Sequence, residues 1–150
     1  MNQLTRIAFL AAIMLGAVIS ALAHREESIE ELKARVAAAK PEDQPKLCIE
    51  IARRDVETAN TLYGDGRVDE ARAAVSEALM YSQKGADAAI QTGKKLKATE
   101  IGIRKMAQRL EDIKRTLNFE DQAPVQAAVD RMQELRTALL KKMFGKENKD

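Results

Sequence analysis

The histidine content limits the catalytic chemistry that this chain could carry out. His24 is the only histidine, so a Ser-His-Asp or Cys-His site would have to use it. The residues before His24 resemble a signal peptide, as described below, and we expect them to be removed during export. His24 would then lie at the frayed N-terminus of the mature chain. Its free amine and ring nitrogen could then chelate copper(II), but copper oxygenases built in this way need a second histidine, which the chain lacks. The sequence therefore predicts neither a catalytic histidine nor a copper site.

Acidic residues are plentiful, and their spacing suits surface ion pairs better than catalysis. Two clusters stand out: Glu26, Glu27, Glu30 and Glu31 at the start, and Glu111 with Asp112 later. Four of these six lie three or four positions before a Lys or Arg, as Glu31 does before Arg35 and Glu111 before Arg115. Such pairs are typical of a solvated helix face. A di-iron bundle uses Glu-x-x-His pairs, and P-loop, G-x-G-x-x-G, G-x-S-x-G and C-x-x-C motifs are all missing from the sequence. We therefore expect a protein that is not an enzyme and needs no metal or cofactor.

Cys48 is the only cysteine, which excludes a disulfide within one chain. In an exported protein a lone cysteine could instead join two chains, so an intermolecular disulfide at Cys48 is one interpretation. The other is that Cys48 packs as a small apolar residue, because it falls on the same helical stripe as Ala52, Ala59 and Tyr63. The pattern favours packing.

Basic residues are concentrated between Lys94 and Arg115, a segment with few acidic residues. One interpretation is that this charge helps neighbouring helices to pair. The other is that it binds an anionic partner, such as a layer of membrane headgroups or an acidic polymer of the envelope. Under the second interpretation the candidate interaction surface is Lys97, Arg104, Lys105 and Arg109. Ala98 and Ile101 could form a further contact face, either to the first helix or to another chain.

The first 23 residues have the pattern of a secretory signal peptide. Arg6 is their only charge, an apolar run from Ile7 to Ile19 follows, and the small residues Ala21 and Ala23 suit a signal peptidase site. We expect cleavage after Ala23, with an uncleaved anchor as the alternative because the run approaches the length that crosses a bilayer. The protein should then be exported through the cytoplasmic membrane, to be periplasmic or secreted.

The composition of the remaining 127 residues is typical of a single helical domain. They lack Trp and contain only four aromatic residues, so the core must be built from aliphatic side chains and Met, which favour helices. Their net charge of +1 argues against a nucleic-acid-binding protein. No further segment is apolar enough to form an integral membrane span after cleavage.

Hydrophobic spacing predicts the helices. The clearest pattern runs from Leu96 to Leu117, where apolar residues recur at alternating three- and four-residue steps, as in a heptad seam. This seam comprises Leu96, Thr99, Ile103, Met106, Leu110, Ile113 and Leu117. The other expected helices are Glu26–Ala39, Gln44–Tyr63, Val68–Thr92 and Gln122–Phe144, the last of them capped by Asp121. In Val68–Thr92 the inner residues are small and include Gly85, which predicts a close approach of a neighbouring helix.

Short links between these helices favour antiparallel neighbours. We therefore expect an all-α fold over residues 24–145: an antiparallel up-and-down helical bundle of four long helices, with a shorter N-terminal helix packed across it. Residues 146–150 should form a solvated tail.

Residues 59–79 combine a small residue, a large one, a turn glycine and a run of apolar and alanine positions. In order these are Ala59, Leu62, Gly66, Val68, Ala71, Val75 and Ala78. The segment resembles one hairpin of the tetratricopeptide repeat family, which implies a helical hairpin and a peptide-binding groove. The family's early Trp and Leu positions hold Asp55 and Thr58, its closing Pro position holds Gln83, and no second copy follows. The rest of the chain is similar to small exported bacterial helical proteins, a likeness that implies no activity.

These observations lead to one functional hypothesis and two alternatives. The hypothesis is an exported, non-enzymatic helical protein that acts through protein–protein or envelope interaction, with a protein or an anionic envelope component as its partner. The first alternative is a self-associating structural protein of the cell envelope, a homo-oligomer joined through heptad helices or Cys48. The second is a peptide-binding, tetratricopeptide-like adaptor.

Overall fold

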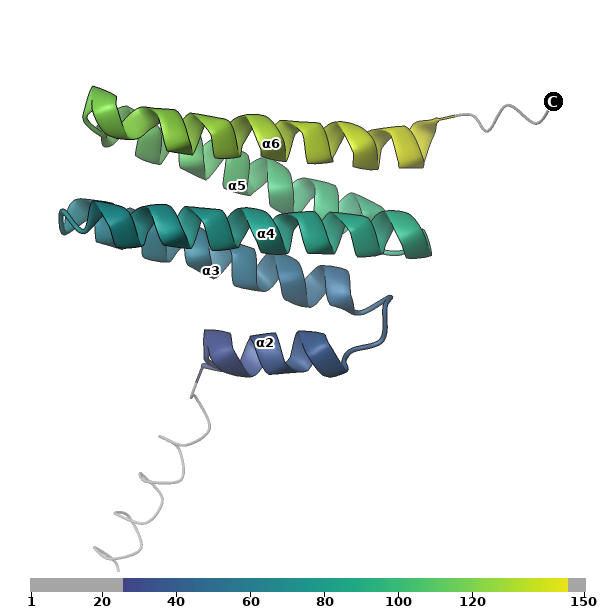
Figure 1. The fold of residues 1–150 in the computed structure, drawn as a ribbon. Coiled ribbons are helices and arrows are strands. Elements are labelled where there is room, and N and C mark those ends of the chain that lie inside the picture. The colour runs from purple at the N-terminus through teal and green to yellow at the C-terminus, as the bar shows by residue number, and fades with distance from the viewer. Residues whose placement is uncertain (1–25, 146–150) are drawn as a thin grey trace, which may run out of the picture.

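A computed structural model describes residues 26–145, which form five helices and no strand. The helices are α2 (Ile29–Ala38), α3 (Gln44–Gly64), α4 (Val68–Thr92), α5 (Leu96–Thr116) and α6 (Phe119–Phe144). In Figure 1, α3 with α4 and α5 with α6 form two antiparallel hairpins in adjacent layers, and α2 lies on the other side of the α3/α4 layer. The predicted all-α bundle is confirmed. The predicted signal peptide and C-terminal tail lie outside the described residues.

The predicted heptad seam of α5 forms the centre of the main core. Ile103, Met106, Leu110 and Ile113 are buried against α3, α4 and α6. Thr99 is also buried, and its hydroxyl donates a 2.9 Å hydrogen bond to the backbone carbonyl of Lys95. The seam residues at the two ends, Leu96 and Leu117, are only partly buried but still pack against the core. The spacing of apolar residues therefore identified the buried face of this helix.

Helix α2 begins later than predicted because Ser28 caps it. The Ser28 hydroxyl accepts from the Glu31 backbone amide at 3.2 Å, and the Glu31 carboxylate accepts from the Ser28 amide at 2.7 Å. This reciprocal pair satisfies two amides that have no partner within the helix. Leu32 and Val36 then pack on α3, with which they form a second small core. In Figure 1, α2 runs alongside α3 and not across the bundle, which corrects the predicted placement.

Helix α6 begins earlier than predicted, so Asp121 is not its N-cap. The helix starts at Phe119 after Asn118 and includes Pro124 in its interior. Asp121 lies in the first turn, where a carboxylate interacts favourably with the helix dipole, and accepts a 2.8 Å ion pair from Arg72 of α4. The sequence pattern, an acidic residue shortly before a proline, predicted that Asp121 caps the helix. The Asp121 carboxylate instead pairs with a residue of another helix.

Two glycines allow α3 to approach its neighbours closely. A Cβ atom added at Gly85 of α4 would lie 3.1 Å from the Cβ of Cys48, and one added at Gly102 of α5 would lie 2.5 Å from the Cγ2 of Ile49. The close approach predicted at Gly85 is confirmed. Gly102 lies outside the seam that the sequence revealed, so its packing role is a finding of the structure.

Substitution of Gly102 by alanine should destabilise the protein by about 1–2 kcal/mol. Alanine gains about 1 kcal/mol of helix propensity, but its methyl group would overlap a branched side chain that has few alternative rotamers in a helix. Gly64→Ala is the matched control, since nothing lies within 4 Å of a Cβ at that position. Urea unfolding should show a loss for Gly102→Ala and none for Gly64→Ala. Equal or greater stability of Gly102→Ala would show that α5 does not pack on Ile49 as described.

Candidate functional site

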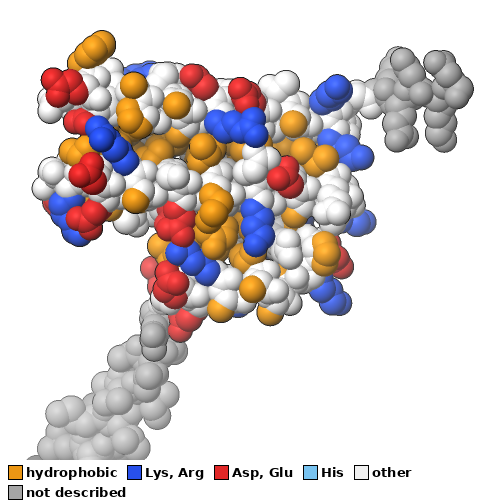
Figure 2. Space-filling view, in the orientation of Figure 1, with side chains coloured by type: hydrophobic (Ala, Val, Ile, Leu, Met, Phe, Trp, Pro, Cys, Tyr) orange, Lys and Arg blue, Asp and Glu red, His pale blue; other side chains and the backbone are white. Residues whose placement is uncertain are grey.

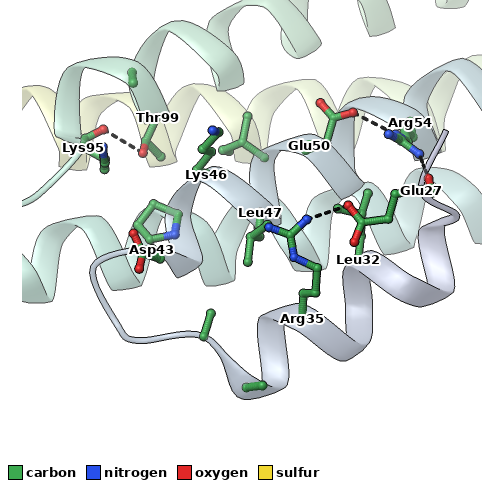
Figure 3. A pocket seen from close by; sticks show the side chains of 15 residues that line it. Glu27, Leu32, Arg35, Asp43, Lys46, Leu47, Glu50, Arg54, Lys95 and Thr99 are labelled. Atoms are coloured by element: carbon green, nitrogen blue, oxygen red, sulfur yellow. Dashed lines mark hydrogen bonds and ion pairs between the residues drawn. The ribbon is translucent and has the colours of Figure 1, made fainter. Parts of the chain in front are cut away.

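A groove of about 1030 Å³ lies between α2 and α5, over the N-terminal half of α3. Figure 3 shows its walls: Leu32 and Arg35 come from α2, and Lys95 and Thr99 come from the start of α5. Its lining also includes Ala38, Ala39, Pro45, Leu47, Ile49 and Ala98. Helices α2 and α5 both flank α3 without packing on each other. Charged residues complete the lining: Glu27, Asp43, Lys46, Glu50 and Arg54. This α2–α5 groove is therefore an open channel between two helices with a mixed apolar and charged lining.

Ion pairs at one end of the α2–α5 groove hold its α2 wall in place. Arg54 of α3 donates to the backbone carbonyl of Glu27 and, at 2.8 Å, to the carboxylate of Glu50. Arg35 pairs with the Glu27 carboxylate at 2.6 Å, as Figure 3 shows. Arg53 also binds Glu50, and its hydrogen bond is the main reason that the pKa of Glu50 lies below its ordinary value. The segment just before α2 is thus attached to α3.

A buried carboxyl group lies behind α2. Asp55 of α3 is 4% exposed, and its Oδ2 has no hydrogen-bond partner among the described residues. Burial raises the pKa of Asp55 from 3.8 to about 7; Glu77 and Glu30 also raise it, and Lys33 partly opposes them. Lys33 of α2 pairs with Glu77 of α4 at 2.5 Å. Helix α2 therefore contacts the bundle through a small apolar core and a cluster of charges that includes Asp55.

Sequence reasoning missed Asp55, although a signal was present. Asp55 lies four residues after Ile51 and four before Ala59, both of which are fully buried. The spacing places it on the inner stripe of α3, and only its residue type argued for the surface. The electrostatic influence of Lys33 on Asp55 depends on how α2 packs, which the periodicity of the sequence does not reveal.

The four predicted cations lie on the outer side of α5, but they differ in their contacts. Arg109 forms a two-pronged pair with Glu57 of α3, with both distances at 3.0 Å, and it therefore helps to join two helices. Arg104 lies 3.8 Å from Glu100. Lys97 and Lys105 are exposed and have no ion pair within residues 26–145. Arg109 therefore fits the interpretation in which the basic charge helps helices to pair. Lys97 and Lys105 fit the interpretation in which the charge is open to an anionic partner.

Glu100 is a second buried acid that the sequence did not single out. It is 8% exposed, and Arg136 of α6 donates to it from two nitrogens, both at 2.9 Å. This charge-assisted contact links the two helices of the second hairpin. Glu100 therefore has an arginine as its ion-pair partner, whereas Asp55 has no ion-pair partner within the described residues.

The sequence offered Ala98 and Ile101 as a possible further contact face, either to the first helix or to another chain. Ala98 instead lines the α2–α5 groove and is exposed, while Ile101 lies in a shallow hollow beside Met143 of α6. The predicted contact with the first helix is therefore absent from the described part of the chain. Within residues 26–145, the surface around Ala98 and Ile101 is not covered by another helix.

Cys48 is fully buried between α2, α3 and α4. Burial raises the pKa of its thiol to about 11, so the reactive thiolate is scarce at neutral pH. An intermolecular disulfide at Cys48 would require the thiol to leave this core. The structure therefore gives Cys48 the packing role that the sequence pattern favoured.

The remaining features of the described chain do not indicate a familiar class of site. Within residues 26–145, no three His, Cys, Asp or Glu side chains are grouped so that they could share a metal ion. None of the helices in this range is both long enough and apolar enough to cross a bilayer. The chain matches no protein-family model, no curated protein and no solved structure.

Proposed function

We propose that this is an exported, non-enzymatic helical protein that works by binding a protein partner of the cell envelope in the α2–α5 groove. The observation that carries the proposal is the groove itself, which is about 1030 Å³ in volume and already formed without a partner. Most of the charges along its α2 side are paired with one another, as Arg35 is with Glu27. A partner would therefore meet a surface that needs little rearrangement, which lowers the cost of binding.

The shape of the groove favours a helical segment as its occupant. Two helical walls on either side of an α3 floor match the arrangement in which an amphipathic helix binds with its apolar face inward. The floor offers Leu47 and Ile49, and the α5 wall offers Ala98, a small residue that leaves room for a side chain of the partner. At one end Asp43, Lys46 and Lys95 have no ion pair within the described residues and are available to orient the partner.

Export is supported by the first 23 residues, whose pattern is that of a signal peptide. Self-association is the second candidate, because Phe119 and Met80 are large apolar side chains that are mostly exposed. A tetratricopeptide-like adaptor remains a narrower form of the first proposal. It is supported by the hairpin of α3 and α4, which turns at Gly66 in a left-handed conformation, φ 74°.

Filling the groove should abolish binding. Ala38→Trp combined with Ala98→Trp places two large side chains in the groove at exposed positions. Ala123→Trp with Ala127→Trp is the matched control on exposed positions of α6. In pull-downs from envelope extract, a protein captured by both the wild type and the control should be missing with the groove variant. Equal capture by all three proteins would contradict the proposal.

Sedimentation across a concentration series separates this proposal from self-association. The groove proposal predicts a monomer in which the groove is free. A stable dimer that dissociates in the groove variant would instead show that a second copy of the chain fills the groove.

A further inference from the structure

Arginine and lysine have different roles in this fold. Every arginine within residues 26–145 takes part in an ion pair. Among the lysines in the same range, only Lys33 and Lys114 do so. The lysines without an ion pair are Lys40, Lys46, Lys84, Lys94, Lys95, Lys97, Lys105, Lys141 and Lys142. Three arginine pairs join different helices, and the others lie within one helix or beside it. The arginines are thus engaged within the protein, while most lysines remain available to a partner.

Five of these unpaired lysines gather at one end of the bundle. Lys94 and Lys95 form the turn between α4 and α5, Lys97 lies in the first turn of α5, and Lys141 and Lys142 lie in the last turn of α6. We call these five residues the lysine end. The two segments are adjacent, because Met143 shares a hollow with Lys95 and Lys97. In Figure 2, Lys and Arg side chains gather at the end of the molecule where α6 ends, while at the opposite end acidic side chains lie among further Lys and Arg side chains.

Within residues 26–145, few acids lie close to the lysine end. Residues 93–99 and 135–145 contain no Asp or Glu. The nearest acid in sequence, Glu100, is already bound by Arg136. Glu42 and Asp43 of the α2–α3 turn share a shallow hollow with Lys94 and Lys95, but no ion pair joins them. The N-terminus of α5 adds a partial positive charge at the same place. The lysine end is therefore a cationic surface.

Apolar side chains are exposed among these lysines. Phe144 is 77% exposed, and Leu140, one helical turn before it on the same side of α6, is 37% exposed. Met143, Leu96 and Ile101 are partly exposed around the adjoining hollow. An acidic polymer would attract the lysines but would gain little from these apolar groups. A bilayer with anionic headgroups offers phosphates to the lysines and an apolar layer to Phe144 and Leu140.

The charge distribution also sets an orientation. The mature chain has a net charge of only +1, so an anionic surface attracts it as a dipole more than as a cation. At the opposite end, the α3–α4 turn and the start of α6 are net negative. Arg67 and Arg72 pair with three of the acids there, but five acids outnumber these two arginines: Asp65, Asp69, Glu70, Glu120 and Asp121. The long axis of the bundle should therefore stand on the lysine end. Lys95 also lines the α2–α5 groove, which opens close to this end.

We propose that the lysine end docks the protein on the surface of an anionic phospholipid bilayer, with Phe144 and Leu140 entering the headgroup layer. This docking uses a different surface from the floor and α2 wall of the groove, and it stands whether or not the groove binds a protein. Each lysine near an anionic surface contributes about fivefold to the affinity. Lysine-end charges should therefore matter far more than lysine charges elsewhere on the molecule.

Vesicle co-sedimentation of the exported protein tests this docking. The probes are vesicles of phosphatidylcholine with and without phosphatidylglycerol. The test variant is Lys97→Glu with Lys141→Glu, and the control is Lys84→Glu with Lys105→Glu, which changes the net charge equally at unpaired lysines away from this end. We expect binding only with phosphatidylglycerol, weakened at least about 25-fold in the test variant and less than about threefold in the control. Phe144→Ser should weaken binding without changing its dependence on salt.

Three results would overturn the proposal. The first is test-variant binding equal to that of the wild type, and the second is an equal loss in the test and control variants, which would mean that net charge alone decides. The third is binding to soluble polyglutamate without binding to the vesicles, which would identify an acidic polymer as the partner. Circular dichroism of each variant verifies that the helices are intact, since all four lysines are exposed and form no contact that folding requires.

Discussion

Substitution of Asp55 by asparagine should stabilise the protein by about 2–4 kcal/mol at pH 8. Asp55 is almost fully buried, its Oδ2 lacks a hydrogen-bond partner, and its charge would lie near Glu77 and Glu30 with only Lys33 to offset them. A buried charge without a close partner is costly. Asparagine has the same shape and no charge, so the fold is kept while this cost is removed.

The effect should depend on pH in a defined direction. The pKa of Asp55 is raised to about 7 in the folded state, above the 3.8 of an unperturbed carboxyl. The folded protein therefore binds a proton that the unfolded chain releases between these values. This contribution to stability is fully present below about pH 4 and is lost as pH rises through 7. Compared with Asp55→Asn, the wild type should lose about 2–3 kcal/mol between pH 5 and pH 8.

Urea unfolding of both proteins at several pH values measures this difference. Asp112→Asn is the matched control, because Asp112 is an exposed carboxylate with one surface pair, to Arg115; its effect should stay within about 0.5 kcal/mol at every pH. Since Lys33 and Glu30 belong to α2, amide exchange in α2 should also speed up with rising pH more than exchange in α5. Asp55→Asn less stable than the wild type at pH 8 would show that Asp55 has a partner that this account lacks.

Truncation of Leu110 to alanine should cost about 3–4 kcal/mol. Leu110 is fully buried at the centre of the main core, where α5 meets α3, α4 and α6. Removal of a buried leucine side chain loses both its transfer free energy and the contacts around the cavity that remains. For a domain of this size, whose total stability is of the order of 5–15 kcal/mol, such a loss is a large fraction.

Leu140→Ala provides the same chemical change on the surface, since Leu140 is 37% exposed in α6. Chemical unfolding should show a loss below about 1 kcal/mol for this variant. Similar losses for Leu110→Ala and Leu140→Ala would contradict the proposed burial of the α5 seam. The comparison isolates burial, because residue type and helical context are matched.

The helices and their inner faces could be predicted because they depend on local periodicity. The α4 bounds, Val68 and Thr92, agree with the prediction, and so do the buried positions of α5. The predictions failed where a side chain forms a contact between helices. Asp121 pairs with Arg72 and does not cap a helix. Helix α2 lies along α3 because its apolar face packs on α3 and Lys33 pairs with Glu77 of the neighbouring α4.

The candidate site likewise depends on contacts between residues that are far apart in the sequence. The α2–α5 groove exists because two helices flank α3 without meeting, and sequence spacing describes each helix separately. The prediction of Lys97, Arg104, Lys105 and Arg109 as one surface grouped residues by charge. The structure separates Arg109, which binds Glu57, from Lys97, which belongs to the lysine end. Charge content could be read from the sequence, but its division between ion pairs and open surface required the fold.

Site-specific photo-crosslinking in the native host tests the central claim, partner binding in the α2–α5 groove, most directly. A photoreactive phenylalanine analogue is placed at position 98, which lines the groove, or at position 127 on the exposed side of α6. The account predicts that position 98 crosslinks reproducibly to one envelope protein and that position 127 does not. Folded protein that gives no crosslink from position 98, or gives the same crosslinks from both positions, would contradict it.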